Sequence, residues 1–237
     1  VNWALAAATY CLVTGEKRWS ETFDQVFQSM RNRADDDGLL VRNSDRCGEN
    51  GIEITTYDSL DESLGQAGGN LYLAVKTWAA YLALAEILPD PAPARELARR
   101  CGRAISRAAL PDGTLPSILD QPESGKIIPA IEGLIFPYYL GLDAALDPAG
   151  EHRELLAALK KHFETILRPG VCLYPDGGWK LSSTADNSWL SKIYLCQFAA
   201  RQILGIDTPA TGSEADAAHV RWLTNPGSAY WAWSDQM

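Results

Sequence analysis

Two aspartates three residues apart, Asp58 and Asp61, are the first candidates for chemistry, in the stretch EITTYDSLDESLGQAGGNLYLAVK. Asp61 or Ser63 suits the start of a following turn, because Asp and Ser oxygens accept hydrogen bonds from free N–H groups there. Asp58 lies too far from the next expected helix to cap it, and it follows Tyr57, which limits its contact with water. Partial desolvation raises the pKa of a carboxyl, as a proton donor at neutral pH requires. Asp58 is therefore the candidate general acid.

A second polar group occupies the stretch 175–197, PDGGWKLSSTADNSWLSKIYLCQ. Asp186, Asn187 and Ser188 offer capping groups for a helix that begins at Trp189, and capping explains one of the three. The tryptophans here and near the C-terminus have many polar neighbours: Trp179, Trp189, Trp231 and Trp233 with Asp176, Lys180, Asp186, Asn187, Lys192 and Asp235. Aromatic faces beside carboxylates and amides suit a carbohydrate, although any one Trp is more often a packing residue. The grouping favours a sugar-binding site.

Two further polar residues, Asn70 and Glu132, each have a structural and a functional interpretation. The three histidines do not indicate a metal site. Asn70, at the end of GQAGGN, is either a helix cap or a sugar contact. Glu132 is one charge in an apolar helix, and a buried unpaired carboxylate is costly, so we expect a partner and favour a structural ion pair over a site role. His152, His162 and His219 lack the i, i+4 spacing of helical metal pairs, so no metal is expected. The sequence has no phosphate loop and no GxGxxG at a strand-to-helix turn, so no cofactor is expected either.

Composition excludes several classes of protein. The 237 residues carry 21 basic and 30 acidic side chains, a net charge of −9, so neither nucleic acid nor an anionic membrane is an expected partner. No apolar run approaches the ~20 residues that span a bilayer. The five cysteines are odd in number and scattered, which favours reduced thiols in a cytoplasm over a disulfide framework.

Apolar residues recur at helical spacing along the whole chain. The expected helices are 2–14, 18–33, 66–88, 93–109, 130–146, 151–168, 188–205 and 213–224, several of them closed by Gly or Pro. Helical hairpins without βαβ alternation predict an all-α fold. Long loops at 34–65, 110–129 and 169–187 would gather at one mouth of an (α/α)6 toroid. These helices fill only part of such a ring, so we expect 1–237 to be a single partial domain of a longer protein.

Several blocks of the chain resemble one enzyme family. They are ITTYDSLDESLGQAGGNLYLAVKTWAAYLAL, SGKIIPAIEGLIFPYYLG, LRPGVCLYPDGGWKLSSTADNSWLSKIYLCQF and AYWAWSDQM. Together they resemble the catalytic domain of glycoside hydrolase family 52, the β-xylosidases. The resemblance implies an (α/α)6 barrel that follows a β-sandwich domain. It also implies retaining hydrolysis of β-xylosides, such as xylo-oligosaccharides, from the non-reducing end without a metal.

The resemblance also assigns roles to residues. The family's general acid/base lies in the Thr-Tyr-Asp block, here Thr56, Tyr57 and Asp58, and a related β-glucosidase family with the same barrel makes Thr56 a sugar ligand. With the residues of the polar and aromatic grouping described above, the expected substrate-binding residues are Thr56, Tyr57, Asn70, Asp186, Asn187, Trp189 and Lys192. The β-sandwich, the first barrel helices and the block with the family's glutamate nucleophile have no counterpart in this sequence.

We therefore expect the isolated chain to be inactive, and to self-associate or to pair with the missing N-terminal part. The alternative is a non-catalytic helical module that binds carbohydrate or another protein.

Overall fold

The computed structural model of the protein describes residues 1–41, 68–225 and 227. Within these ranges the chain forms helices and loops, and extended pairing is limited to isolated bridges such as Asn70 with Ile118. The α-helices are α1 (Asn2–Thr14), α2 (Ser20–Arg33), α3 (Leu71–Ala85), α4 (Ala92–Arg107), α5 (Ile135–Tyr139), α6 (Asp143–Leu146), α7 (Arg153–Ile166), α8 (Leu190–Phe198) and α9 (Ser213–Thr224). The all-α prediction is confirmed for this part of the chain.

Three further helical turns complete the described elements. They are the 3₁₀-helices η4 (Ile128–Leu134) and η6 (Pro209–Thr211), and the π-helix η5 (Ala199–Ile203), which continues directly from α8. Gly15 ends α1 and Gly205 follows η5, with positive φ angles of 73° and 63°, as expected of glycines that close helices. No helix in the described ranges is both long enough and apolar enough to cross a membrane.

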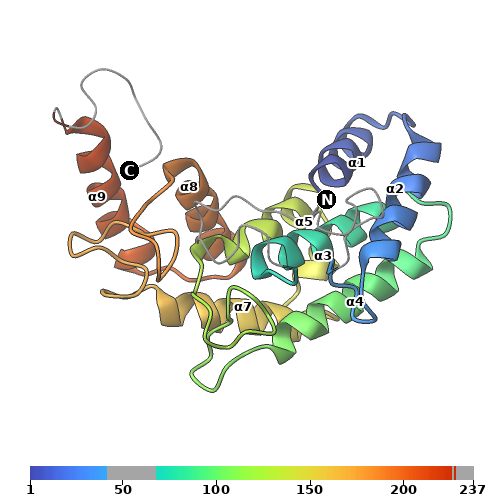
Figure 1. The fold of residues 1–237 in the computed structure, drawn as a ribbon. Coiled ribbons are helices and arrows are strands. Elements are labelled where there is room, and N and C mark those ends of the chain that lie inside the picture. Colours follow the sequence, from blue (N-terminus) through green and yellow to red (C-terminus); the bar gives the residue numbers. More distant parts are fainter. Residues whose placement is uncertain (42–67, 226, 228–237) are drawn as a thin grey trace.

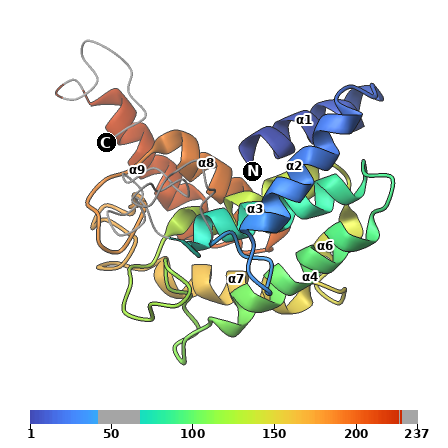
Figure 2. The same ribbon diagram turned by 45° about the vertical axis from the view of Figure 1, so that its right-hand side comes forward.

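Helix α3 lies at the centre of the molecule (Figures 1 and 2). Its sequence LYLAVKTWAAYLALA is apolar on all sides, and every residue except Leu73 is buried, as a helix without a polar face requires. It packs against α1, α4, η4 and α5. Asn70 is the N-cap residue of this largely buried helix.

Helices α4 and α7 are amphipathic and pack against each other, and α4 also packs against the central helix α3. In α4 the apolar residues Ala94, Ala98, Cys101 and Ile105 are buried at helical spacing, whereas Arg100 is exposed. Figure 1 shows α4 and α7 along the convex side of an arc, with the pair α1 and α2 at one end and the pair α8 and α9 at the other. An arc of paired helices fits part of a toroid, and its completion as an (α/α)6 barrel stays a prediction.

The single helix expected over 130–146 is wrong, because the chain there forms η4, α5 and α6 in succession. Pro137 lacks the backbone N–H that would bond back into η4, and Gly141 ends α5 with a φ of 67°. Gly133 in η4 lies against α3, where a Cβ would stand 2.8 Å from Val75 Cγ1 and 2.9 Å from its carbonyl oxygen. Glycine is therefore needed at 133 for the two elements to cross so closely.

Candidate functional site

Three helical elements distant in sequence bring four polar side chains together inside the apolar core. Tyr72 and Lys76 lie one turn apart on α3, Glu132 comes from η4, and Lys192 lies in the first turn of α8. The ammonium Nζ of Lys76 lies 2.8 Å from Glu132 Oε1, and that of Lys192 lies 2.8 Å from Glu132 Oε2. Both oxygens of one buried carboxylate are thus held by a different lysine.

The hydroxyl of Tyr72 closes this set of interactions. It accepts hydrogen bonds from Lys76 Nζ at 2.7 Å and from Lys192 Nζ at 2.8 Å, and it donates to Glu132 Oε1 at 3.2 Å. A phenol has one donor and two acceptor positions, so its hydrogen-bonding capacity is fully used. We call Tyr72, Lys76, Glu132 and Lys192 the lysine–glutamate network.

The opposite charges in this network act against the effect of burial on the pKa values of Glu132 and Lys192. Burial alone would raise the pKa of Glu132, but Lys76 and Lys192 together lower it below its usual value. Burial would lower the pKa of Lys192, yet the Glu132 carboxylate raises it. Two ammonium groups face one carboxylate, so the network carries one surplus positive charge.

The expectation that Glu132 has a structural partner is confirmed, and the structure shows two. Lys192 is predicted from the sequence as a sugar-binding residue and not as a partner of Glu132, and Tyr72 and Lys76 are not among the predicted residues. The available signal was the position of Lys76: it is the one charged residue in an otherwise apolar helix, like Glu132 in its own segment. When two buried charges of opposite sign each lack a charged neighbour in their own segment, an ion pair between them is expected.

Asn70 is a helix cap. Its side-chain oxygen accepts the backbone N–H of Leu73 at 2.8 Å, and the residue is 1% exposed. Its neighbour Leu71 donates its backbone N–H to the carbonyl of Ser117, which attaches the start of α3 to the loop 108–127. Of the two interpretations of Asn70 the capping one is confirmed, and a contact to sugar stays a prediction.

The polar residues before α8 have interactions within the described structure. Asp186 is exposed and forms an ion pair with Lys180 Nζ at 3.0 Å. The backbone carbonyl of Asn187 accepts the N–H of Leu181. The predicted side-chain cap of α8 is wrong: the N-cap is Trp189, which has no acceptor to offer, and Ser188 is buried one residue too early. Lys192, which follows these residues in the first turn of α8, is the predicted residue of this region that belongs to the lysine–glutamate network.

Two tryptophan-containing contacts in the same region are structural. Trp179 is completely buried, and its indole N–H donates to the carbonyl of Ala210 at 2.8 Å. Asp176 accepts the indole N–H of Trp222 at 2.8 Å. The packing interpretation therefore holds for Trp179, whereas Trp189 is only half-buried and lies three residues before Lys192.

The remaining predicted site residues, Thr56, Tyr57 and Asp58, lie outside the described residues, as do Trp231, Trp233 and Asp235. Among the described residues, no group of three or more His, Cys, Asp or Glu side chains could hold a metal ion. The candidate site in the described part is thus the lysine–glutamate network, which can offer a ligand hydrogen bonds and a positive charge.

Over the residues that the structure describes, these features define an all-helical fold with a buried, positively charged network where three helical elements meet. No protein-family model matches the chain. The chain is similar to Beta-xylosidase from Geobacillus stearothermophilus: the two are 48% identical over 252 aligned residues, which cover 100% of this chain and 36% of that protein. The chain therefore spans little more than a third of the length of this curated relative.

Proposed function

We propose that this chain is part of a retaining β-xylosidase that releases xylose from the non-reducing end of xylo-oligosaccharides. The observation that carries the proposal is the 48% identity to a β-xylosidase, because it extends over the whole chain. The all-helical fold agrees with the (α/α)6 barrel that the family resemblance implies. No metal or cofactor has a part in the proposed reaction.

Asp58 is the proposed general acid/base. In a retaining glycosidase one carboxylic acid protonates the leaving oxygen while a carboxylate about 5 Å away attacks the anomeric carbon. The same acid, now ionised, then deprotonates the water that releases the sugar. The tyrosine before Asp58 supports this role, since partial desolvation raises the pKa of a proton donor.

Glu132 is a poor candidate for the nucleophile. It is ionised, as a nucleophile must be, but both of its oxygens are engaged by ammonium groups at 2.8 Å and its side chain is 7% exposed. An attacking oxygen needs a free lone pair directed at the substrate. We assign Glu132 a positioning role, and we propose that the nucleophile lies outside this chain, so that the chain by itself is inactive.

The proposed substrate contacts are Thr56, Tyr57, Asn70, Asp186, Asn187, Trp189 and Lys192. For Lys192 the structure offers a specific argument. An ammonium has three N–H donors, and within the described residues Tyr72 and Glu132 accept two of those of Lys192. The third is available for a sugar hydroxyl, and the side chain is 17% exposed. The network thus fixes the position of a donor at the start of α8.

A cytoplasmic location and self-association belong to the same proposal. The thiols of Cys11, Cys101 and Cys196 are free and buried, which suits a reducing compartment. Helix α1 supports association with another copy or with a further part of the protein, because Trp3 and Val13 are 43% and 70% exposed on a helix with few polar residues.

The test of the function is turnover of 4-nitrophenyl β-xyloside by the full-length protein that contains this chain, beside the β-glucoside and the α-arabinoside. We expect the β-xyloside to be hydrolysed with the highest kcat/KM. Saturable binding of xylobiose without hydrolysis of any aryl glycoside would instead identify a non-catalytic carbohydrate-binding module.

A further inference from the structure

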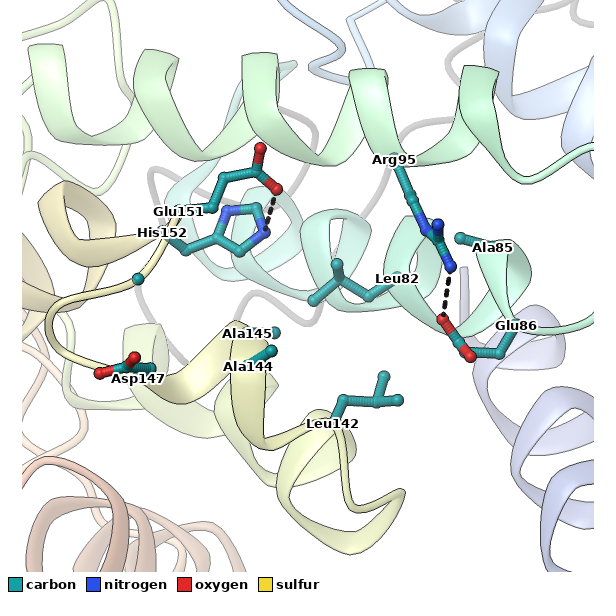
Figure 3. Close-up of a pocket in the computed structure, with 11 residues that line it drawn as sticks. Leu82, Ala85, Glu86, Arg95, Leu142, Ala144, Ala145, Asp147, Glu151 and His152 are labelled. Carbon is teal, nitrogen blue, oxygen red and sulfur yellow. Dashed lines mark hydrogen bonds and ion pairs between the residues drawn. The ribbon is translucent and has the colours of Figure 1, made fainter.

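A cavity of about 400 Å³ lies between α3, α4, α6 and the segment 147–152 that leads into α7. It is near the end of α3 that is distant from the lysine–glutamate network, about 15 Å away along the helix axis. Figure 3 shows Leu82 between two polar pairs of side chains. The pairs are Glu151 with His152, and Arg95 with Glu86. Most of the remaining lining is apolar and comes from Ala85, Leu142, Ala144 and Ala145.

The charged groups at the cavity compensate one another. Glu86 pairs with Arg95 at 3.4 Å. Arg99 Nε approaches Glu151 Oε1 at 3.6 Å from outside the lining. Asp147 is exposed, and its carboxylate accepts a backbone N–H of its own turn at 2.9 Å, away from Glu151. The cavity therefore presents no net charge to a ligand, and it favours a neutral molecule over an ion.

The imidazole of His152 presents a hydrogen-bond donor to the cavity. The residue is 6% exposed, and its Nδ1 accepts the indole N–H of the completely buried Trp78 at 3.3 Å. An indole N–H only donates, so Nδ1 carries no proton. Burial lowers the pKa of His152, against the opposing effect of Glu151, so the ring is neutral near pH 7 and its proton is on Nε2. No described residue accepts this N–H.

A gap of 4.0 Å separates Nε2 of His152 from Oε2 of Glu151. The gap is too long for a direct hydrogen bond, but one oxygen atom fits between the two groups. With ordinary hydrogen bonds of about 2.7–2.9 Å to each, that oxygen bridges them at an angle of about 90°. It has to accept the Nε2–H and donate a proton to the carboxylate. A hydroxyl does both, whereas an ether, an ammonium or a carboxylate does only one.

We propose that this cavity binds a small neutral alcohol. Its hydroxyl lies between His152 and Glu151. Its hydrocarbon part packs on Leu82, Leu142 and Ala145. Water makes the same two hydrogen bonds but leaves these apolar side chains hydrated, so burial of apolar surface favours the alcohol. A molecule of the size of benzyl alcohol fits a cavity of about 400 Å³. The site is separate from the proposed glycosidase chemistry and does not depend on it.

Four probes with one aromatic ring separate the hydroxyl from charge: benzyl alcohol, benzyl methyl ether, benzylamine and benzoate. Their dissociation constants for the full-length protein are measured by ligand-observed NMR titration at pH 7.5. We expect the alcohol to bind roughly tenfold more tightly than the ether, the scale of one hydrogen bond, and neither ion to bind more tightly than the ether. Equal affinities of alcohol and ether, tightest binding of either ion, or no saturable binding of the alcohol would overturn the proposal.

Matched variants locate the binding. Glu151→Ala removes the proposed acceptor of the hydroxyl proton, and it should reduce the affinity for benzyl alcohol to that for the ether. Glu154→Ala is the control, because Glu154 is nearby on α7 and its side chain is 64% exposed outside the cavity lining. Ala144→Phe, at an exposed position of the lining, fills the cavity and should abolish saturable binding. Binding that neither Glu151→Ala nor Ala144→Phe weakens would place the alcohol elsewhere and contradict the proposed site.

Discussion

The carboxylate of Glu132 and the ammonium of Lys192 lie 2.8 Å apart although 60 residues of chain separate them. This contact ties η4 to the first turn of α8, and the second contact of Glu132, with Lys76, ties both to α3. Because the side chain of Glu132 is 7% exposed, its charge is balanced by these lysines and not by water. The network therefore links three helical elements, and we propose that it also positions Lys192 for substrate binding.

Glu132→Gln should destabilise the protein strongly. The amide keeps the shape of the side chain but leaves two buried ammonium groups without an anion, and breaking a buried ion pair costs about 3–5 kcal/mol. Urea unfolding at pH 7.5 measures this loss. Glu154→Gln, a change at an exposed position, should stay within about 0.5 kcal/mol of the parent protein. A loss of similar size in both variants would contradict the assignment of Glu132.

Tyr72→Phe should have a smaller but clear effect. It removes a hydroxyl that accepts from Lys76 and Lys192 and donates to Glu132, and it leaves the ring in place. Unsatisfied buried donors cost about 1–3 kcal/mol, so we expect a loss in this range. The control is Tyr139→Phe, since Tyr139 is 64% exposed, and it should leave the free energy of unfolding unchanged. An unchanged stability of Tyr72→Phe would mean that the hydroxyl bonds are dispensable.

Stability should fall between pH 6.5 and pH 4 because of two buried histidines. His162 accepts the N–H of Leu115 and hydrogen-bonds the carbonyl of Ile127, and His219 accepts the N–H of Trp179. Burial lowers the pKa of each to about 4. Below the unfolded pKa of about 6.5 the unfolded chain binds protons that the native state does not, so acid favours unfolding, by up to about 3 kcal/mol per histidine.

Urea unfolding of the parent protein and of His162→Gln at pH 7.5 and pH 5 checks this prediction. The variant is expected to be less stable at pH 7.5, but the difference between its two stabilities should be smaller than in the parent protein. An identical pH dependence in both proteins would show that His162 titrates normally in the native state.

Two glycine substitutions should have effects of opposite sign. Gly133→Ala places a methyl group 2.8–2.9 Å from Val75 and should destabilise the protein by about 1–3 kcal/mol through overpacking. Gly102→Ala, inside α4, meets only ordinary contacts of 3.5 Å or more and should stabilise it by about 0.5–1 kcal/mol through helix propensity. Thermal unfolding of the two variants measures both effects, and a stabilised Gly133→Ala would show that η4 and α3 do not cross closely.

The sequence predicted the helices best where periodicity was uninterrupted. The helices expected at 2–14 and 213–224 have the predicted bounds. A glycine marks one end of each: Gly15 follows the first helix and Gly212 precedes the second. The helix expected at 130–146 is three shorter elements, since Pro137 and the close crossing at Gly133 override the apolar pattern. Periodicity gives no information on how near a second helix will pass.

The candidate site was only partly predictable. The need of Glu132 for a partner followed from the cost of burying a charge, but its partners Lys76 and Lys192 lie 56 and 60 residues away, and their pairing depends on tertiary structure. Trp179 looked like a loop aromatic with a polar environment, yet it is buried against Phe163 and His219. Local sequence does not distinguish an aromatic side chain that faces a ligand from one that faces the core.

The most direct test of the central claim is the effect of Asp58→Asn on hydrolysis of two aryl β-xylosides by the full-length protein, beside Asp61→Asn as the control. If Asp58 is the general acid, kcat/KM for phenyl β-xyloside, whose leaving group needs a proton, should fall by about 10²–10⁴. The value for 2,4-dinitrophenyl β-xyloside, whose leaving group does not, should fall far less, and Asp61→Asn should change neither value by more than a few-fold. Retention of phenyl β-xyloside hydrolysis in Asp58→Asn, or equal losses for the two aspartates, would contradict the account.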